Sequence, residues 1–175
     1  QGNQLLILTS SQELAMQVTE VVRTWAQCID LTVQPLIGSA NTKRQVEKLK
    51  SKPEVLIGTP GRVLELIKAK KIKTQQISML VLDEVDQLLK DGQLGLAAKI
   101  NQTLTKQAQR CFFSATANEV ITEIQPFVET KPVVIDVTAE DQSKGVIPHY
   151  YLDYPQRRIV DALRRLAHLP AFQGL

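Results

Sequence analysis

The sequence predicts an α/β fold: a doubly wound parallel β-sheet with flanking helices. Short runs rich in β-branched and apolar residues alternate along the chain with segments whose apolar residues have helical spacing. The runs are continuously apolar rather than alternating, as in residues 5–8 and 80–82, which is typical of strands buried on both faces of a parallel sheet. The 175 residues are 43% hydrophobic and 22% charged, which is enough apolar surface for a folded core.

Six segments have the length and composition of strands and are bounded by turn-forming residues. They are residues 4–9, 32–37, 55–59, 77–83, 110–115 and 132–137.

The segments between these strands have helical patterns. In the first helix, one apolar stripe is predicted to face the core, formed by Leu14, Val18, Val21, Val22, Trp25 and Ile29. Ser10 with Glu13, and Thr116 with Glu119, have the spacing of capping boxes. Thr59 followed by Pro60 is typical of an N-cap with proline in the first helical position.

The composition changes after residue 137. We expect a first domain over residues 1–137, a polar linker over 138–148 and the opening of a second domain over 149–175, with an amphipathic helix near 156–168. The chain begins Gln-Gly-Asn-Gln, without Met or a signal sequence, so we expect an N-terminally truncated piece. The longest apolar runs reach about five residues, far below the roughly 20 of a membrane span, so no membrane association is expected.

Positive charge is concentrated in one region. Residues 41–75 hold ten basic and three acidic residues, a local charge of +7, so the rest of this +3 chain sums to −4. This pattern indicates a surface for a polyanion, although a solvated helix face explains it equally simply. Cys28 and Cys111 lie among apolar residues without metal-ligand spacing, so we expect buried thiols in a reducing, cytoplasmic compartment.

Asp83 and Glu84 directly follow a predicted strand. Ligands bind at the carboxyl ends of the strands of open parallel sheets, so these acids are candidate site residues. An aspartate at that position can hold hydrated Mg²⁺, and the adjacent glutamate can activate a water, as a nucleotide hydrolase requires. Alternatively, both acids only complement the dipole of the helix that follows.

Thr59, Gly61 and Arg62 follow another strand and open a helix. A hydroxyl, a glycine backbone open to close approach and a guanidinium at a helix N-terminus together suit a phosphodiester backbone. The alternative is an ordinary strand-to-helix turn with an exposed arginine. Thr116, near Ser114, is by itself a sufficient N-cap.

Five segments in this order resemble the successive motifs of the first domain of DEAD-box RNA helicases, which has a RecA-like fold. They are residues 10–15, 38–39, 59–62, 83–86 and 114–116. The resemblance extends over residues 4–137, and residues 149–175 are similar to the start of that family's second RecA-like domain.

The resemblance implies an enzyme, an RNA-stimulated ATPase and helicase that binds ATP, Mg²⁺ and RNA and separates short duplexes. Asp83 and Glu84 then contact the nucleotide, Asp83 holding Mg²⁺ through water and Glu84 activating the hydrolytic water. Asp86, Ser114 and Thr116 couple the nucleotide state to unwinding. The implied RNA contacts are Ser11, Gln12, Gly38, Thr59, Gly61 and Arg62, and basic residues 43–52 add salt-sensitive affinity.

Several positions depart from the family pattern. Val85 replaces the alanine of the signature tetrapeptide, Gln12 replaces an arginine, and Ser39 replaces the second glycine of a pair. No phosphate-binding Gly-x-x-x-x-Gly-Lys sequence occurs, so we expect these 175 residues alone to be inactive. The strand that carries that loop would lie beside residues 110–115, so we also expect marginal stability or self-association.

Two other functions compete with the enzyme. A non-catalytic RNA-binding or scaffold protein could retain the fold without nucleotide chemistry. A flavodoxin-like or receiver-like signalling domain could use Asp83 as a phosphate acceptor, but it gives no reason for residues 59–62 and 114–116 together.

Overall fold

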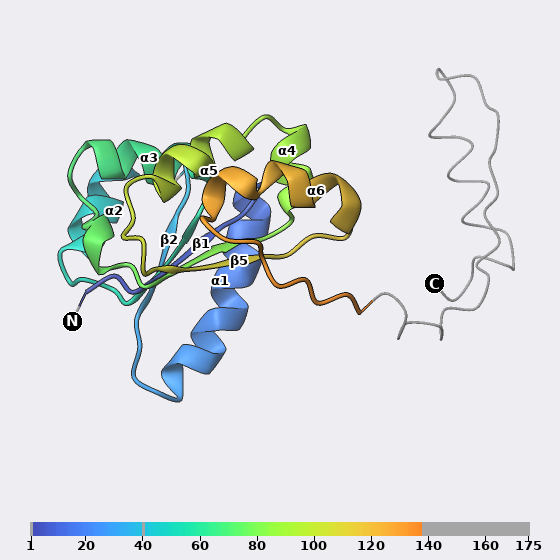
Figure 1. Cartoon of the computed structure of the whole chain (residues 1–175). Coiled ribbons are helices and arrows are strands. Elements are labelled where there is room, and N and C mark those ends of the chain that lie inside the picture. The colour runs from blue at the N-terminus through green and yellow to red at the C-terminus, as the bar shows by residue number, and fades with distance from the viewer. Residues whose placement is uncertain (1, 40, 138–175) are drawn as a thin grey trace, which may run out of the picture. The chain divides into compact units, whose positions relative to one another are not determined.

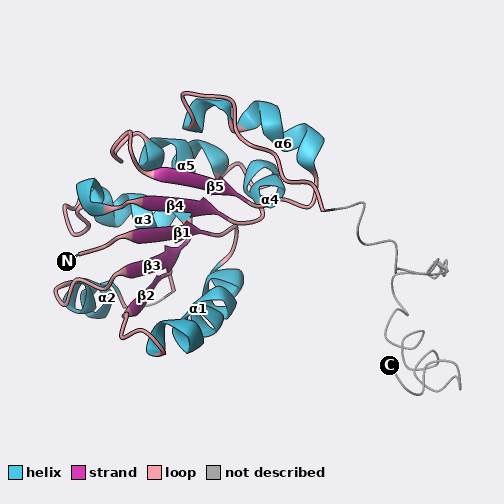
Figure 2. Ribbon diagram, turned by 60° about the horizontal axis from the view of Figure 1, so that its bottom comes forward, coloured by secondary structure: helices cyan, strands magenta, loops and turns pink. Residues whose placement is uncertain are grey.

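The computed structural model describes residues 2–39 and 41–137, which contain a five-stranded parallel sheet in the order β2-β3-β1-β4-β5 (Figure 2). The strands are β1 (Leu5–Leu8), β2 (Val33–Leu36), β3 (Val55–Gly58), β4 (Met79–Leu82) and β5 (Gln109–Phe112). The helices are α1 (Gln12–Gln27), α2 (Thr42–Leu49), α3 (Pro60–Lys68), α4 (Val85–Lys90), α5 (Leu94–Asn101) and α6 (Ala117–Glu123), with short 3₁₀ turns η1 (Thr74–Gln76) and η2 (Gln125–Phe127).

Helices cover both faces of the sheet (Figure 1). The larger core joins side chains of α2 to α6 to one face of the strands and includes Leu6, Leu56 and Leu80, all fully buried. The smaller core lies under α1 and includes Ile7, Ala15 and Ile57. The predicted α/β class and flanking helices are therefore confirmed.

The position of each strand in the sheet follows from its residues. β1 is central, pairing Leu5 with Val55 on one side and Met79 on the other, and β3 is buried throughout. β2 is an edge strand, where Pro35 lacks an N–H without breaking the ladder. A Cβ atom on Gly58 would stand 2.2 Å from the backbone oxygen of Leu36, so the close contact of β3 with β2 requires glycine.

The sixth predicted strand, residues 132–137, is wrong. This segment forms no regular element, and its side chains are exposed, with Val133 at 90% and Ile135 at 83%. β-branched residues favour strands because they pack on a pleated surface, and no described strand lies beside this segment to provide one.

Two expectations about α1 and the cysteines are also wrong. Val21, Trp25 and Ile29 are exposed rather than buried, because only the half of α1 nearest β2 and β3 is covered by the sheet. Cys28 is exposed at the end of α1, and Cys111 is half-buried on β5, where α1 does not reach.

The predicted helix starts at Thr59 and Thr116 are correct, whereas the N-cap of α1 lies one residue later than predicted. Ser11, not Ser10, caps α1, accepting from Leu14 N at 3.1 Å, and Thr116 precedes α6 without a side-chain cap. Thr59 and Pro60 open α3 as predicted. The predicted linker, second-domain start and helix 156–168 lie outside the described residues. None of the described helices combines the length and apolar character that crossing a bilayer requires.

Candidate functional site

The carboxyl ends of the five parallel strands lie side by side along the boundary of the sheet that runs across the strands. We call this boundary the strand-end edge. Backbone hydrogen bonds continue beyond the strands there: Asp83 N donates to Leu8 O at 2.9 Å, and Val85 N donates to Phe113 O at 3.0 Å. Segments that are distant in the sequence are thereby brought together, as a parallel sheet predicts.

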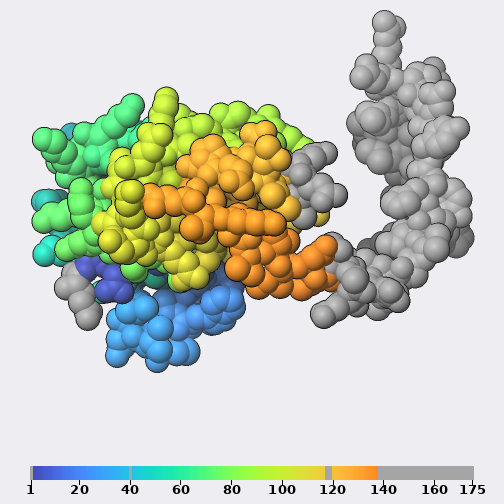
Figure 3. Space-filling view, in the orientation of Figure 1, coloured from blue at the N-terminus to red at the C-terminus, as the bar shows by residue number. Residues whose placement is uncertain are grey.

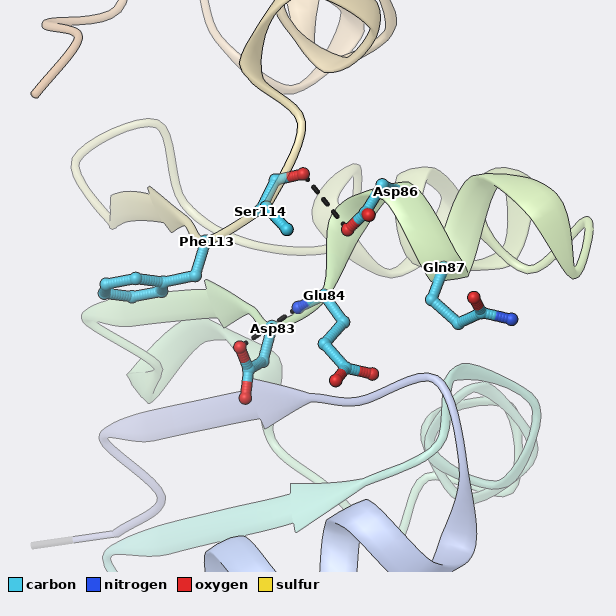
Figure 4. Close-up of a pocket in the computed structure, with 7 residues that line it drawn as sticks. Asp83, Glu84, Asp86, Gln87, Phe113 and Ser114 are labelled. Carbon is cyan, nitrogen blue, oxygen red and sulfur yellow. Dashed lines mark hydrogen bonds between the residues drawn. The ribbon is translucent and has the colours of Figure 1, made fainter. Parts of the chain in front are cut away.

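A pocket of about 370 Å³ opens at the ends of β4 and β5 (Figure 4). It is lined by Asp83, Glu84, Asp86, Gln87, Phe113, Ser114 and Ala115. Three carboxylates therefore line one concave surface beside a hydroxyl and an aromatic ring. Sequence reasoning identified the acids and Ser114 but not Gln87 or Phe113, because neither belongs to a motif with an evident chemical role.

Glu84 has an unusual backbone conformation. Its φ of 48° and ψ of 56° place it in the left-handed region just before α4. A residue other than glycine held there costs of the order of 1–3 kcal/mol, and such strain concentrates at functional sites. Ser10 Oγ donates to Glu84 Oε2 at 3.0 Å, and Gln93 Nε2 donates to Ser10 O at 2.8 Å. The Glu84 side chain is thus held in place from β1 and from the start of α5.

Asp83 directly follows β4 and is half-buried. Glu84 N donates to Asp83 Oδ1 at 3.0 Å, which favours the charged carboxylate. Burial acts in the opposite direction and is stronger, so the pKa of Asp83 lies above its ordinary value, with the Glu84 charge adding to the rise. A cation bound at this carboxylate would offset that cost, because opposite charge stabilises the ionised form.

The three residues expected to act together do lie together. Ser114 Oγ donates to Asp86 Oδ1 at 3.1 Å and accepts from Thr116 N at 3.2 Å. Asp86 belongs to the first turn of α4, and Ser114 follows β5. The Ser114 hydroxyl therefore connects Asp86 at the pocket to Thr116, which directly precedes α6.

The ends of β1, β2 and β3 form the other half of the strand-end edge. Gln12 Oε1 accepts from Ser39 N at 3.1 Å, which joins the start of α1 to the loop after β2. Ser11 uses its hydroxyl to cap α1. A Cβ atom on Gly38 would come within 3.3 Å of Gln12 Nε2, so this loop already packs closely on Gln12.

Thr59, Gly61 and Arg62 differ in what they offer to a ligand. Thr59 makes no side-chain cap bond, and a Cβ atom on exposed Gly61 would meet only Leu96 Cδ1 at 4.0 Å. The fold does not demand glycine at position 61, so its open backbone is available to a ligand. Arg62 points inward: its side chain is 6% exposed. Its guanidinium donates to Gln45 Oε1 at 3.3 Å, Glu65 Oε2 at 2.7 Å and Thr42 Oγ1 at 2.6 Å.

Sequence reasoning missed the supporting residues Ser10, Thr42, Gln45 and Gln93. Gln45 Nε2 also donates to Ile37 O at 2.7 Å, so Gln45 ties α2 to the end of β2 as well as to Arg62. No local signal identifies such residues, because each acts on a partner at least 8 positions away in the sequence.

The carboxylates at the pocket suit a hydrated divalent cation. Among residues 2–39 and 41–137, no group of three or more His, Cys, Asp or Glu side chains is arranged to enclose a metal ion. Mg²⁺ needs no such cage, since it keeps several waters and is commonly held by one or two carboxylates together with substrate phosphates. Asp83 and Glu84 provide that donor set.

Comparison with known proteins gives a consistent result. The DEAD/DEAH box helicase family model matches residues 1–124. The chain is 39% identical over 172 residues to "Probable ATP-dependent RNA helicase YfmL" of Bacillus subtilis, covering 98% of this chain and 46% of that protein. It is 35% identical over 166 residues to the DEAD-box ATP-dependent RNA helicase CshC of Bacillus cereus, covering 95% of this chain and 42% of that protein. The chain thus spans less than half the length of these relatives.

Solved structures share the fold. A Saccharomyces cerevisiae Dbp5 variant bound to Gle1 and IP6 superposes with a TM-score of 0.67 at 30% identity, covering 76% of this chain and 34% of that one. A DEAD box protein of Methanococcus jannaschii gives a TM-score of 0.73 at 24% identity, over 97% of this chain and 45% of that one. The sheet and its helices are therefore those of a RecA-like helicase domain.

Proposed function

This chain belongs to the DEAD/DEAH box helicase family, and we propose that the protein carrying it is an ATP-dependent RNA helicase. The observation that carries the proposal is that hydrogen bonds connect the two halves of the strand-end edge, namely the ends of β4 and β5 and the ends of β1, β2 and β3. The acids after β4 line a pocket, and Ser10 connects Glu84 to the segment that leads into Gln12 and Ser39. Nucleotide chemistry and RNA contact would therefore be physically linked.

In this proposal Asp83 would hold hydrated Mg²⁺. Glu84 would orient, and take a proton from, the water that attacks the γ-phosphate, with ADP as the leaving group. Mg²⁺ would supply charge neutralisation of the ATP phosphates when bound. Ser10 keeps the Glu84 carboxylate in one orientation, and the left-handed backbone at Glu84 fixes where its side chain leaves the chain. Phosphoryl transfer depends on such positioning more than on covalent chemistry.

We assign the coupling of the two halves to Asp86, Ser114 and Thr116. The Ser114 hydroxyl bonds to both neighbours, so loss of either bond as the pocket changes would release the segment before α6. Such a two-position element is what coupling between two sites requires.

RNA would lie along the ends of β1, β2 and β3. Thr59, Gly61 and the Gly38 loop present a hydroxyl and backbone groups, and Ser11 and Gln12 border them at the start of α1. Such contacts read the sugar-phosphate backbone and not the base sequence. Arg62 supports this surface from below by fixing α2 to α3, a role that its buried hydrogen bonds favour over direct phosphate contact.

The two cysteines indicate in which cellular compartment the protein works. Cys28 and Cys111 are both free thiols, and an exposed free thiol such as Cys28 persists in a reducing compartment. We therefore place the protein in the cytoplasm.

The test is ATP hydrolysis by the protein carrying this chain, with and without RNA, beside Glu84→Gln. Exposed Glu20 on α1 provides the matched control, Glu20→Gln. RNA-stimulated turnover that only Glu84→Gln abolishes supports the helicase-type ATPase. Background turnover in a folded protein that still binds RNA would overturn it in favour of a non-catalytic RNA-binding protein.

A further inference from the structure

Four lysines lie within residues 68–73, where α3 ends and the chain turns toward β4. We call Lys68, Lys70, Lys71 and Lys73 the strand-start lysine cluster, because strands begin at this edge of the sheet. All four are exposed, and none takes part in an ion pair with a described residue. The proposed nucleotide and RNA sites do not use them, since those sites occupy the opposite edge.

The other charges named at this edge do not add to its positive charge, which therefore comes from the strand-start lysine cluster itself. Lys50 and Lys52 end the α2 segment just before β3, which is separated from β4 only by β1. Lys50 pairs with Glu47 at 2.6 Å, whereas Lys52 has no acidic partner. Asp30 lies at the same edge before β2. Glu54 contributes negative charge there, because it accepts from Thr32 N at 3.0 Å and Thr32 Oγ1 at 2.8 Å, and these hydrogen bonds lower its pKa and favour the carboxylate.

Stabilisation of helices does not explain so many lysines. One or two cations suffice to complement the C-terminal end of a helix dipole, and Lys68 already occupies the last turn of α3. Lys52 and Lys70 moreover have φ values of 55° and 56°, the left-handed conformation that follows a helix and normally selects glycine. Lysine occupies both positions despite that preference.

We propose that the strand-start lysine cluster is a second RNA-binding surface, which holds the phosphate backbone of RNA extending beyond the strand-end edge. This inference rests on the proposed function. Lysine is a flexible point charge, which suits contact with phosphates irrespective of base sequence. Apart from Ala69, the only apolar residue among positions 68–73 is Ile72, which is 5% exposed, so nothing in the segment could insert into a lipid surface.

The two surfaces face opposite ways. The C-terminal ends of α2 and α3 lie on the side where the N-terminus lies, and α4 and α6 lie on the other (Figure 1). Residues near 60–80, green in the space-filling view, form much of the outer surface on that first side (Figure 3). A short RNA would occupy the strand-end edge alone, whereas a longer RNA could reach both.

The experiment compares two RNA lengths on the protein carrying this chain. Single-strand sites span about 4–16 nucleotides, so a probe of about 8 nucleotides occupies one surface and a probe of about 40 can reach both. We expect Lys70→Gln, Lys71→Gln and Lys73→Gln together to weaken binding of the long probe about tenfold at low salt. The salt dependence of log K should fall by roughly 2, as loss of three single-strand phosphate contacts predicts. Binding of the short probe should be unchanged.

The matched control removes the same charge elsewhere, with Arg23→Gln, Lys90→Gln and Lys131→Gln, and circular dichroism verifies the fold of both proteins. Unchanged binding of the long probe, an equal loss for both probes, or an equal loss in the control would each overturn the proposal. Loss of binding to phosphatidylserine vesicles with RNA binding intact would identify a lipid surface instead. If the proposed function fails, RNA does not stimulate ATP hydrolysis. The comparison of RNA lengths measures binding only, so the two failures can be distinguished.

Discussion

Ser10 Oγ donates to Glu84 Oε2 at 3.0 Å, joining the end of β1 to the residue before α4 across 74 positions of sequence. The Ser10 carbonyl in turn accepts from Gln93 Nε2. The carboxylate to which we assign activation of the hydrolytic water is thus held by a hydroxyl on the side of the site that we assign to RNA.

Ser10→Ala should lower the turnover of RNA-stimulated ATP hydrolysis about tenfold, because supporting partners of reactive groups typically contribute 10–100-fold. The KM for ATP should stay nearly unchanged, since Ser10 does not contact the nucleotide in our assignment. Steady-state kinetics measures both values. Ser51→Ala is the control, because the Ser51 hydroxyl bonds only to Lys48 O, at an exposed site. Wild-type turnover in Ser10→Ala would show that Glu84 needs no such support.

Asp83→Asn should raise the melting temperature in the absence of divalent cations while abolishing ATP hydrolysis. Burial raises the pKa of Asp83, so the folded state binds this proton more tightly than the unfolded state does. The ionised carboxylate therefore destabilises the fold as pH rises through the folded-state pKa. We therefore expect the melting temperature of Asp83→Asn to exceed that of the wild type at neutral pH. The difference in melting temperature between Asp83→Asn and the wild type should disappear on acidification. Calorimetry at several pH values measures this difference, and a difference that grows on acidification would contradict the prediction.

Thr59→Ala should weaken binding of a short single-stranded RNA about tenfold, the effect of one hydrogen bond to a charged group. Its hydroxyl makes no cap bond in α3, so the free energy of unfolding should change by less than about 0.5 kcal/mol. Fluorescence anisotropy gives the affinity and urea titration gives the stability. Thr24→Ala, at an exposed position of α1, is the matched control. A stability loss that parallels the loss of affinity would assign Thr59 to the fold.

Arg62→Ala should destabilise the domain by about 2–3 kcal/mol, because it removes the hydrogen bonds from Arg62 to buried Gln45 and to Thr42 together with a packed side chain. Arg62→Lys should recover only part of this, since an ammonium cannot reproduce the forked geometry. Urea unfolding measures both. Glu65→Gln should have little effect, as the Glu65 side chain is 58% exposed. Normal stability with lost RNA affinity in Arg62→Ala would instead show that the guanidinium binds phosphate directly.

The sequence predicted the fold where local pattern and tertiary context agree. Five strands, the parallel sheet and the start of α3 follow from apolar runs and from Thr59-Pro60. Residues 132–137 have an equally good strand pattern, but a pattern cannot tell whether a neighbouring strand exists to pair with. In α1 the same limit applies, because helical spacing identifies an apolar stripe without showing how far the sheet extends beneath it.

The candidate site was predictable to a similar degree. Acids and hydroxyls at strand ends were found because parallel strands bring their ends together. What the sequence could not indicate was the direction of a side chain. The Arg62 side chain points into the protein. Ser10 bonds to Glu84, and Ser11 rather than Ser10 caps α1. These choices depend on partners distant in the sequence and are settled only when the whole domain is assembled.

The central place of β1 has a consequence for how the protein is made. β1 precedes both of its partners in the sequence, since β3 and β4 begin at Val55 and Met79. At roughly 5–20 residues per second, the ribosome takes about 3–10 seconds to make the first of these partners after β1 emerges. During that interval four consecutive apolar residues have no strand to pair with. Nascent chains of this protein are thus expected to engage chaperones while β1 is still unpaired.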